Sequence, residues 1–292
     1  MQNPLSSFWA KLPIWLRAIV SGLVIGLSAA NMWPLLLLNF RAPLAAIAEA
    51  VFLAFYLFWA AGGGPPRMTQ MSRAASFRRG KRSRAQWFWG GIGALFFAVT
   101  VHASIVLLFR FVAFPLAAFR RGYDLSFIPG LALKWLAVVV SAASAGICEE
   151  TGFRGYMQAP MEKRYGAPVA IFVSSLFFTA QHLSKGWATP GMIPIVFGAG
   201  VPLGLVAWSS GSLIPGMVGY ILMDVGLFAY WWTGIAGNFA ERPVVETGVD
   251  PPFVIECMVL AVSLLVLVFA IWKIRKHLTS QGFLSRSAAR QQ

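Results

Sequence analysis

The sequence predicts an all-α, multi-pass integral membrane protein with about eight transmembrane helices. Hydrophobic residues make up 58% of the 292 residues and charged residues only 12%, a balance outside the range of soluble globular domains. The apolar residues also gather into stretches close to the roughly 20 residues that a helix needs to cross a bilayer. Backbone polar groups in hydrocarbon must be satisfied within their own segment, so these stretches are expected to be helical.

Eight apolar stretches reach about this spanning length. They lie at residues 18–38, 43–61, 87–109, 128–148, 167–184, 190–208, 212–232 and 253–272. The first contains Ser28-Ala-Ala30, which is similar to a signal-peptide cleavage site, but its apolar run continues to Leu38. That run is too long for a typical signal sequence. We therefore expect the first span to be retained.

Basic residues are unevenly distributed between the loops. If the amino terminus is cytoplasmic, 17 of the 24 Lys and Arg residues lie in cytoplasmic segments, seven of them between residues 63 and 86. The loop 233–252 on the other side carries Glu241, Glu246 and Asp250. An excess of Lys and Arg marks the cytoplasmic side, so we expect both termini to be cytoplasmic.

The net charge of +14 follows from this topology, because the basic residues lie in loops and tails beside apolar spans. The expected partner is therefore the lipid bilayer, and no nucleic-acid partner is expected. The compact architecture gives the impression of a bacterial protein, and we expect it in the plasma (inner) membrane of a bacterium.

A Gly/Pro cluster at residues 62–66 is the clearest boundary in the chain. We expect residues 1–127 to form amino-terminal transmembrane helices with a basic cytoplasmic loop at 63–86. Residues 128–232 are expected to form the core that carries the chemistry, because polar residues inside apolar stretches concentrate there. Residues 233–292 are expected to form an acidic loop, the last transmembrane helix and a basic tail.

Two adjacent carboxylates, Glu149 and Glu150, end the fourth apolar stretch, and Arg154 follows them. Charged side chains in a bilayer are costly and generally functional. On a helix, Glu150 and Arg154 are four residues apart and can pair on one face, whereas Glu149 is rotated by about 100°. The spacing predicts that Glu150 holds Arg154 and that Glu149 is free to act as a base.

His182 ends the fifth apolar stretch. Glu149 and His182 are equidistant from Tyr165-Gly166-Ala167-Pro168, a plausible turn. With a helix on each side, each arm is roughly 25 Å long, so an antiparallel hairpin would return both side chains to the same depth. Pro160 is expected to kink or end the first helix.

A glutamate with a histidine is typical of hydrolases. The basic residues between positions 154 and 164 suggest a site that is reached from the cytoplasmic side. A structural alternative stays open for each residue. In it, Glu150 and Arg154 are a satisfied ion pair and His182 is an interfacial residue.

Glu149-Glu150-Thr-Gly-Phe-Arg154 resembles the EExxxR motif of the CAAX prenyl protease and bacteriocin-processing (CPBP, Abi) family of intramembrane glutamic proteases. Phe178 to His182 resembles the FxxxH motif of this family. The similarity continues through the Gly-rich stretch 197–204 and the segment 211–215, and it covers roughly residues 128–232. The last family motif is His-x-x-x-Asn or His-x-x-x-Asp, and here the register gives Tyr220-Ile-Leu-Met-Asp224.

The resemblance implies an intramembrane endopeptidase that hydrolyses a peptide bond near the membrane. In the family, the first glutamate and the first histidine are thought to activate water, and the last motif to steady the oxyanion. Carried over, Glu149 and His182 would activate the water. Tyr220, or Asp224 when protonated, would donate to the oxyanion. The expected catalytic residues are Glu149, Glu150, Arg154, His182, Tyr220 and Asp224.

The implied substrate is a membrane-associated peptide or protein, with or without a prenyl group. No cofactor is expected. Because Tyr220 stands where the family has histidine, only Glu149, His182 and Asp224 would remain as metal ligands. A zinc mechanism is therefore the less favoured alternative.

Two other functions stay open. A catalytically impaired family member would use the same pocket to bind a peptide or lipid partner, and Tyr220 motivates this alternative. A proton-coupled transporter would use the intramembrane carboxylates and histidine as a relay. The sequence shows no repeated halves of the kind common in transporters.

Overall fold

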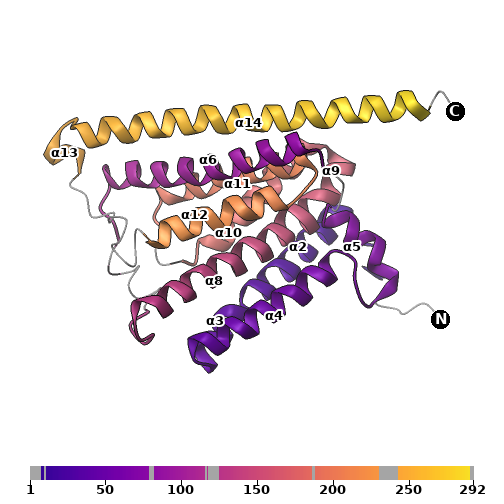
Figure 1. Cartoon of the computed structure of the whole chain (residues 1–292), viewed down its shortest axis with the longest axis horizontal. Coiled ribbons are helices and arrows are strands. Elements are labelled where there is room, and N and C mark those ends of the chain that lie inside the picture. The colour runs from indigo at the N-terminus through magenta and orange to yellow at the C-terminus, as the bar shows by residue number, and fades with distance from the viewer. Residues whose placement is uncertain are drawn as a thin grey trace.

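The computed structural model describes residues 8–9, 11–78, 82–115, 117, 125–185, 188–229 and 243–289. These residues form a bundle of helices with no strand among them (Figure 1). The predicted all-α fold class is confirmed. The end of the seventh predicted stretch, at 230–232, and Glu241 of the predicted acidic loop lie outside the described residues.

Within the described part of the chain, six helices are long and apolar enough to cross a membrane. They are Ile14–Asn39, Ala42–Ala60, Arg84–Phe109, Leu131–Tyr165, Met192–Ser210 and Pro251–His277. Two shorter apolar helices, α10 (Ala167–His182) and α12 (Ile214–Phe228), fall on the remaining two predicted stretches. Each of the eight predicted stretches therefore coincides with an apolar helix, which confirms the multi-pass architecture.

The first span is divided into two helices, and the second span is followed by two short helical elements. The elements up to the loop after the second span are α2 (Ile14–Ala30), α3 (Met32–Asn39), α4 (Ala42–Ala60), η1 (Arg67–Thr69) and α5 (Gln70–Ser76). The first span breaks at Asn31. Pro34 explains the break, because its ring opposes the carbonyl of the residue four positions earlier and it has no N–H to donate.

The remaining elements follow in chain order. They are α6 (Arg84–Phe109), α8 (Leu131–Glu150), η2 (Thr151–Gln158), α9 (Ala159–Tyr165), α10, α11 (Met192–Ser210), α12, α13 (Val244–Thr247) and α14 (Pro251–Ala289). α14 packs along α6, and α6 in turn packs on α12 (Figure 1). The predicted site residues lie on α8, η2, α10 and α12.

The fourth span is one continuous helix over residues 131–165, made of α8, the π-helical η2 and α9. Pro160 was predicted to kink or end this helix. The prediction of an end was wrong, because the helix continues to Tyr165. Pro160 lies in the first turn of α9, immediately after the π-helical segment. Proline is tolerated at the start of an α-helical segment, where its missing N–H is not needed.

The predicted helical hairpin is present. α9 ends at Tyr165, Gly166 has φ 84° and ψ 160°, and α10 begins at Ala167 with Pro168 in its first turn. A positive φ favours glycine, so the sequence supports this turn at the required position. α10 then returns along η2 and α9.

Three glycines let α2 and η2 approach closely. A Cβ atom at Gly152 would lie 2.6 Å from the carbonyl oxygen of Gly22 and 2.6 Å from the Cα of Gly26. Small residues at helix interfaces permit such backbone contact in membrane proteins. The contact fixes η2, which carries Arg154, against the first span.

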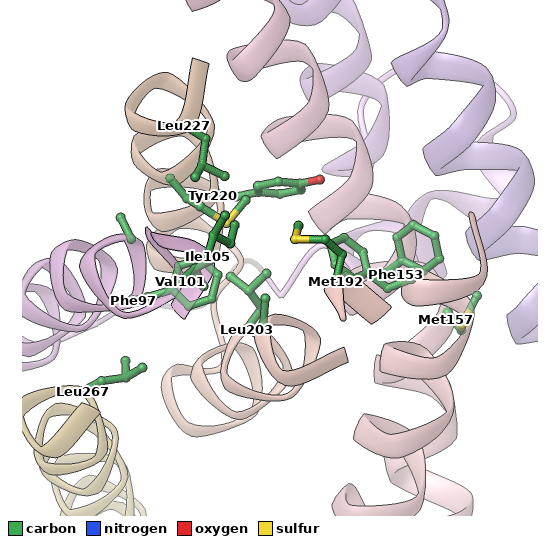
Figure 2. Packing of buried hydrophobic residues seen from close by; sticks show 14 of the residues in the cluster. Phe97, Val101, Ile105, Phe153, Met157, Met192, Leu203, Tyr220, Leu227 and Leu267 are labelled. Carbon is green, nitrogen blue, oxygen red and sulfur yellow. The ribbon is translucent and has the colours of Figure 1, made fainter. Parts of the chain in front are cut away.

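The largest buried cluster draws on all three predicted parts of the chain. It includes Ala18, Phe97, Phe153, Tyr220 and Leu267, four of which are labelled in Figure 2. These parts therefore pack on a common core. The division of the chain into three regions stays a prediction about organisation along the sequence.

The start of α2, the short helix α5 and the end of α14 lie at the same end of the bundle (Figure 1). The basic loop between α4 and α6 lies there too, and we call this end the basic end. At the opposite end, Arg110 Nη2 donates to Asp250 Oδ2 at 2.7 Å, and this hydrogen bond lowers the pKa of Asp250. The segregation of basic residues agrees with the predicted orientation, which stays a prediction.

Replacing Gly152 with alanine is expected to lower the thermal unfolding temperature of the detergent-solubilised protein. The added methyl would overlap the backbone of α2, and overpacking of this kind costs about 1–3 kcal/mol. Gly91→Ala in α6 is the matched control, because a Cβ there meets nothing within 4 Å and alanine favours the helix by about 1 kcal/mol. Equal losses of unfolding temperature in the two variants would contradict the close packing of α2 and η2.

Candidate active site

Four of the six predicted site residues line one cavity of about 430 Å³. Glu149 comes from the end of α8, His182 from the end of α10, and Tyr220 and Asp224 from α12. Tyr220 is buried, and the other three side chains are half-buried. The structure thus brings together four polar groups that are far apart along the chain.

Glu150 and Arg154 form the predicted ion pair. Arg154 Nη1 lies 2.9 Å from Glu150 Oε1, and neither side chain is exposed. Gly216 of α12 leaves the space for this pair, because a Cβ at that position would lie 2.6 Å from Glu150 Oε2. A buried charge without a partner is strongly destabilising, so each member of the pair requires the other.

Arg154 also ties η2 to two further helices. Its Nη2 donates to the carbonyl oxygen of Gly200 in α11 at 3.0 Å, and its guanidinium lies 4.4 Å from the ring centroid of Phe178 in α10. One turn later, Gln158 Nε2 donates to the carbonyl oxygen of Gly204 at 2.9 Å. Two donors on η2 therefore meet two glycine carbonyls on α11 with the same spacing.

Close packing against η2 and α10 explains two glycines of α11. A Cβ at Gly204 would lie 2.9 Å from Gln158 Oε1, and one at Gly200 would lie 2.9 Å from Ser175 Cβ. Gln158 was not among the site residues predicted from the sequence. Its polar side chain in an apolar segment, four residues after Arg154, is the signal that could have indicated it.

Glu149 does not pair with Arg154, but it is held by two other donors. Gln181 Nε2 donates to Glu149 Oε2 at 2.6 Å, and the hydroxyl of Tyr220 donates to the same oxygen at 2.9 Å. The prediction that Glu149 lacks Arg154 as a partner agrees with this geometry, but the two donors to Glu149 were not predicted. Gln181 was missed, although it is a polar residue next to His182 in an otherwise apolar helix.

The two bonds to Oε2 fix the carboxylate of Glu149 from two helices, α10 and α12. Oε1 is the oxygen that these two donors leave unengaged. The hydroxyl of Tyr220 points away from Phe97 and Val101 (Figure 2), so the ring packs in the apolar cluster while its polar end reaches the cavity. In this arrangement Tyr220 is a donor to the glutamate.

His182 is oriented by Phe178, one turn earlier on α10. Its Nδ1 lies 2.7 Å from the carbonyl oxygen of Phe178, and the two rings lie 4.8 Å apart. A carbonyl only accepts, so Nδ1 carries the hydrogen of this bond and Nε2 of the neutral ring can accept a proton. The Phe178 ring also contacts the edge of Tyr220, with centroids 5.8 Å apart.

The cavity lies toward the end of the bundle that is opposite the basic end. Its lining includes Asn31, Pro34, Ser184, Lys185 and Leu227, which lie at helix ends away from the basic loop. The expectation of access from the basic side was therefore wrong. The hairpin explains why, because arms of roughly 25 Å from the turn at Gly166 place the site most of a bilayer thickness from that turn.

The donor set for a metal is limited. Among the described residues, no group of three His, Cys, Asp or Glu side chains is placed to hold a metal ion. Cys148 is buried and does not line the cavity. The side chains that face the cavity can donate and accept protons, and they can bind a polar group between α8, α10 and α12.

Arg154→Met is expected to destabilise the protein by about 3–5 kcal/mol, because it leaves the buried carboxylate of Glu150 without a cation. Adding Glu150→Gln should recover part of this loss, since the double variant removes both charges. Thermal unfolding of the natural chain, both single variants and the double variant in the same detergent measures these losses. If the double variant is as unstable as the two single changes added together, the residues do not act as a pair.

Residues 128–226 match the model of a family described as Type II CAAX prenyl endopeptidase Rce1-like. The matched segment is about a third of the chain, and it contains all six predicted site residues. No curated protein and no solved structure matches the chain. The resemblance to the CAAX prenyl proteases is thereby confirmed over residues 128–226, where the chain is similar to the type II, Rce1-like endopeptidases.

Proposed function

We propose that the protein is an intramembrane endopeptidase that hydrolyses a peptide bond of a membrane-associated substrate. One observation carries the proposal. Within the segment similar to the Rce1-like endopeptidases, Glu149, His182, Tyr220 and Asp224 line a single cavity. A carboxylate and a neutral imidazole on the wall of one cavity of about 430 Å³ are suited to activate water for attack on a carbonyl.

Glu149 is the proposed general base. Its Oε2 is held by Gln181 and Tyr220, which leaves Oε1 to take a proton from a water molecule. His182 supports this step, since its Nδ1 is engaged by the Phe178 carbonyl and its Nε2 can accept a hydrogen bond from the same water. The water oxygen bonds to the peptide carbon, and the proton then passes to the leaving amine as the C–N bond breaks.

The oxyanion needs a donor. Because the hydroxyl of Tyr220 is already bonded to Glu149, we assign this role to Asp224 in its protonated form, four residues further along α12. A neutral carboxylic acid can donate a hydrogen bond, whereas an ionised one cannot. Tyr220 then acts as a positioning residue for the base.

Glu150 and Arg154 are proposed to act through structure. Their buried pair fixes the end of α8 and therefore the direction in which Glu149 points. We propose that the reaction uses no metal or cofactor, since water activation is assigned to protein side chains. The proposed location is the inner membrane of a bacterium, with both termini cytoplasmic and substrates with or without a prenyl group.

Tyr220 favours a second candidate function, that of an impaired family member that binds a peptide or lipid. The family has histidine at this position, and here the phenol occupies one oxygen of the proposed base. A chain of this kind would keep the cavity and its ligand while hydrolysing slowly or not at all. The variants at Tyr220 separate the two candidates.

Glu149→Gln is expected to reduce peptide hydrolysis by about 10²–10⁴-fold, the usual contribution of a general base. The purified protein is incubated with a panel of prenylated and unprenylated peptides, and the products are measured by mass spectrometry. Glu246→Gln is the control, because Glu246 is exposed on α13 and does not line the cavity. Unchanged cleavage by the Glu149 variant would eliminate this mechanism.

Tyr220→Phe removes the hydroxyl and keeps the ring that packs against Phe178. If Tyr220 positions the base of an active enzyme, kcat should fall at least about tenfold with little change in KM, because one hydrogen bond to a carboxylate contributes about 1.5–3 kcal/mol. In the impaired alternative, the natural chain binds peptide without cleaving it, and Tyr220→His creates activity. Kinetics of the three proteins on one peptide substrate distinguish these outcomes.

A further inference from the structure

A second cavity of about 720 Å³ lies at the basic end of the bundle. It is enclosed by α2, the segment from η1 to α5, and the junction of η2 with α9. These elements lie together at one end of the molecule (Figure 1). The cavity shares no lining residue with the one that contains Glu149.

The lining of this second cavity is strongly cationic. Arg17, Arg73, Lys163 and Arg164 all face it, and none of the described lining residues is Asp or Glu. Glu162, which neighbours two of them in sequence, pairs with Arg78 at 2.6 Å and does not line the cavity. The cavity therefore offers an anion four positive charges with no carboxylate on its wall.

Arg73 is buried, with 2% of its surface exposed. All its hydrogen-bond acceptors in the described structure are neutral. They are the carbonyl oxygens of Trp59, Gly63, Gly64 and Pro66 and the hydroxyl of Thr69. Neutral acceptors satisfy the N–H groups but leave the charge uncompensated, so Arg73 contributes a fixed positive potential at the cavity floor.

Arg17 adds an unused donor. Its Nε is buried and makes no hydrogen bond to a described residue. It lies in the first turns of α2, whose start has no side-chain cap, and the amide groups at a helix start favour negative charge. Lys163 and Arg164 have exposed side chains that can close on a bound anion without breaking an existing ion pair in the described structure.

Beside the cations and the hydroxyl residues Ser21, Thr69, Ser72 and Ser76, the cavity has an apolar and aromatic side. Trp59 and Tyr156 stack with ring centroids 6.4 Å apart and an interplanar angle of 8°, and Ile14, Ile25 and Pro160 complete this side. Contact with such a surface would add no binding free energy for an inorganic anion. An amphiphile would gain from both halves of the cavity, because its head meets the cations and its chains meet the apolar wall.

We propose that this cavity binds the phosphate head group of an anionic phospholipid. The phosphate lies among Arg17, Lys163 and Arg164, with the potential of Arg73 beneath it, and the acyl chains run along the apolar side of α2. The position fits this occupant, since the cavity lies where the spans end at the basic side and where phospholipid head groups meet a membrane protein. The proposal is independent of the proposed peptidase activity.

The test measures binding of dioctanoyl phosphatidylglycerol to the purified full chain in neutral detergent by calorimetry. Dioctanoyl phosphatidylcholine and inorganic phosphate are the comparison probes. We expect phosphatidylglycerol to bind at least tenfold more tightly than either. Affinity for phosphatidylglycerol at low salt should fall on the order of 100-fold in the triple variant Arg17→Gln, Lys163→Gln, Arg164→Gln, because each basic residue contributes about fivefold.

The control is the triple variant Lys273→Gln, Arg275→Gln, Lys276→Gln on α14. It removes the same charge near the same end of the bundle, and none of these residues lines the cavity. Its affinity for phosphatidylglycerol should stay within about threefold of the natural chain, since a charge at distance is largely screened. Unfolding temperatures of both triple variants close to that of the natural chain verify that they are folded.

Three results would overturn the proposal. Equal loss of affinity in the two triple variants would indicate general attraction of anions to the basic end. No loss in the cavity variant would place the lipid elsewhere. Binding of inorganic phosphate as tight as that of phosphatidylglycerol would assign the cavity to a free anion rather than to a lipid.

Discussion

The rest of the site depends on the contacts that the buried guanidinium of Arg154 makes. This group is fully buried in a segment of a membrane-spanning helix, where a charge is tolerated only with close partners. Its partners come from three elements, namely Glu150 at the end of α8, the Gly200 carbonyl in α11 and the Phe178 ring in α10. Because these contacts must all be made at once, they fix how α8, α10 and α11 meet around η2.

The same arrangement gives two neighbouring glutamates different environments. Glu150 is enclosed with its cation and has no exposed surface, whereas Glu149 is turned toward the cavity and accepts bonds from Gln181 and Tyr220. The carboxylate of Glu150 thus stabilises the fold, and that of Glu149 can contact a ligand in the cavity. Adjacent residues on a helix point in directions about 100° apart, which is what permits this separation of roles.

Much of this could be predicted from local sequence. The spacing of Glu150 and Arg154 predicted their pair, and the position of Gly166 midway between Glu149 and His182 predicted the hairpin. The bond from Gln181 to Glu149 could not be predicted, because it joins two helices and no periodicity within either one specifies it. The helix likewise continues through Pro160 because a π-helical segment precedes it. No pattern of residues in the sequence predicted that segment. The position of the cavity follows from the length of the two hairpin arms. The basic residues near the turn suggested access from the wrong end of the bundle.

Tyrosine in place of histidine changes the chemistry available beside the base. A histidine next to a glutamate can exchange a proton with it near neutral pH, whereas a phenol keeps its proton there and only donates a hydrogen bond. Tyr220 can therefore hold Glu149 without competing with it for the proton of the water. In the proposed mechanism, hydrogen-bond donation to the oxyanion at this wall of the cavity falls to Asp224, one turn further along α12. Under that proposal the positioning of the base and the donation to the oxyanion are tasks of separate residues, and the geometry of one can be disturbed without removing the other.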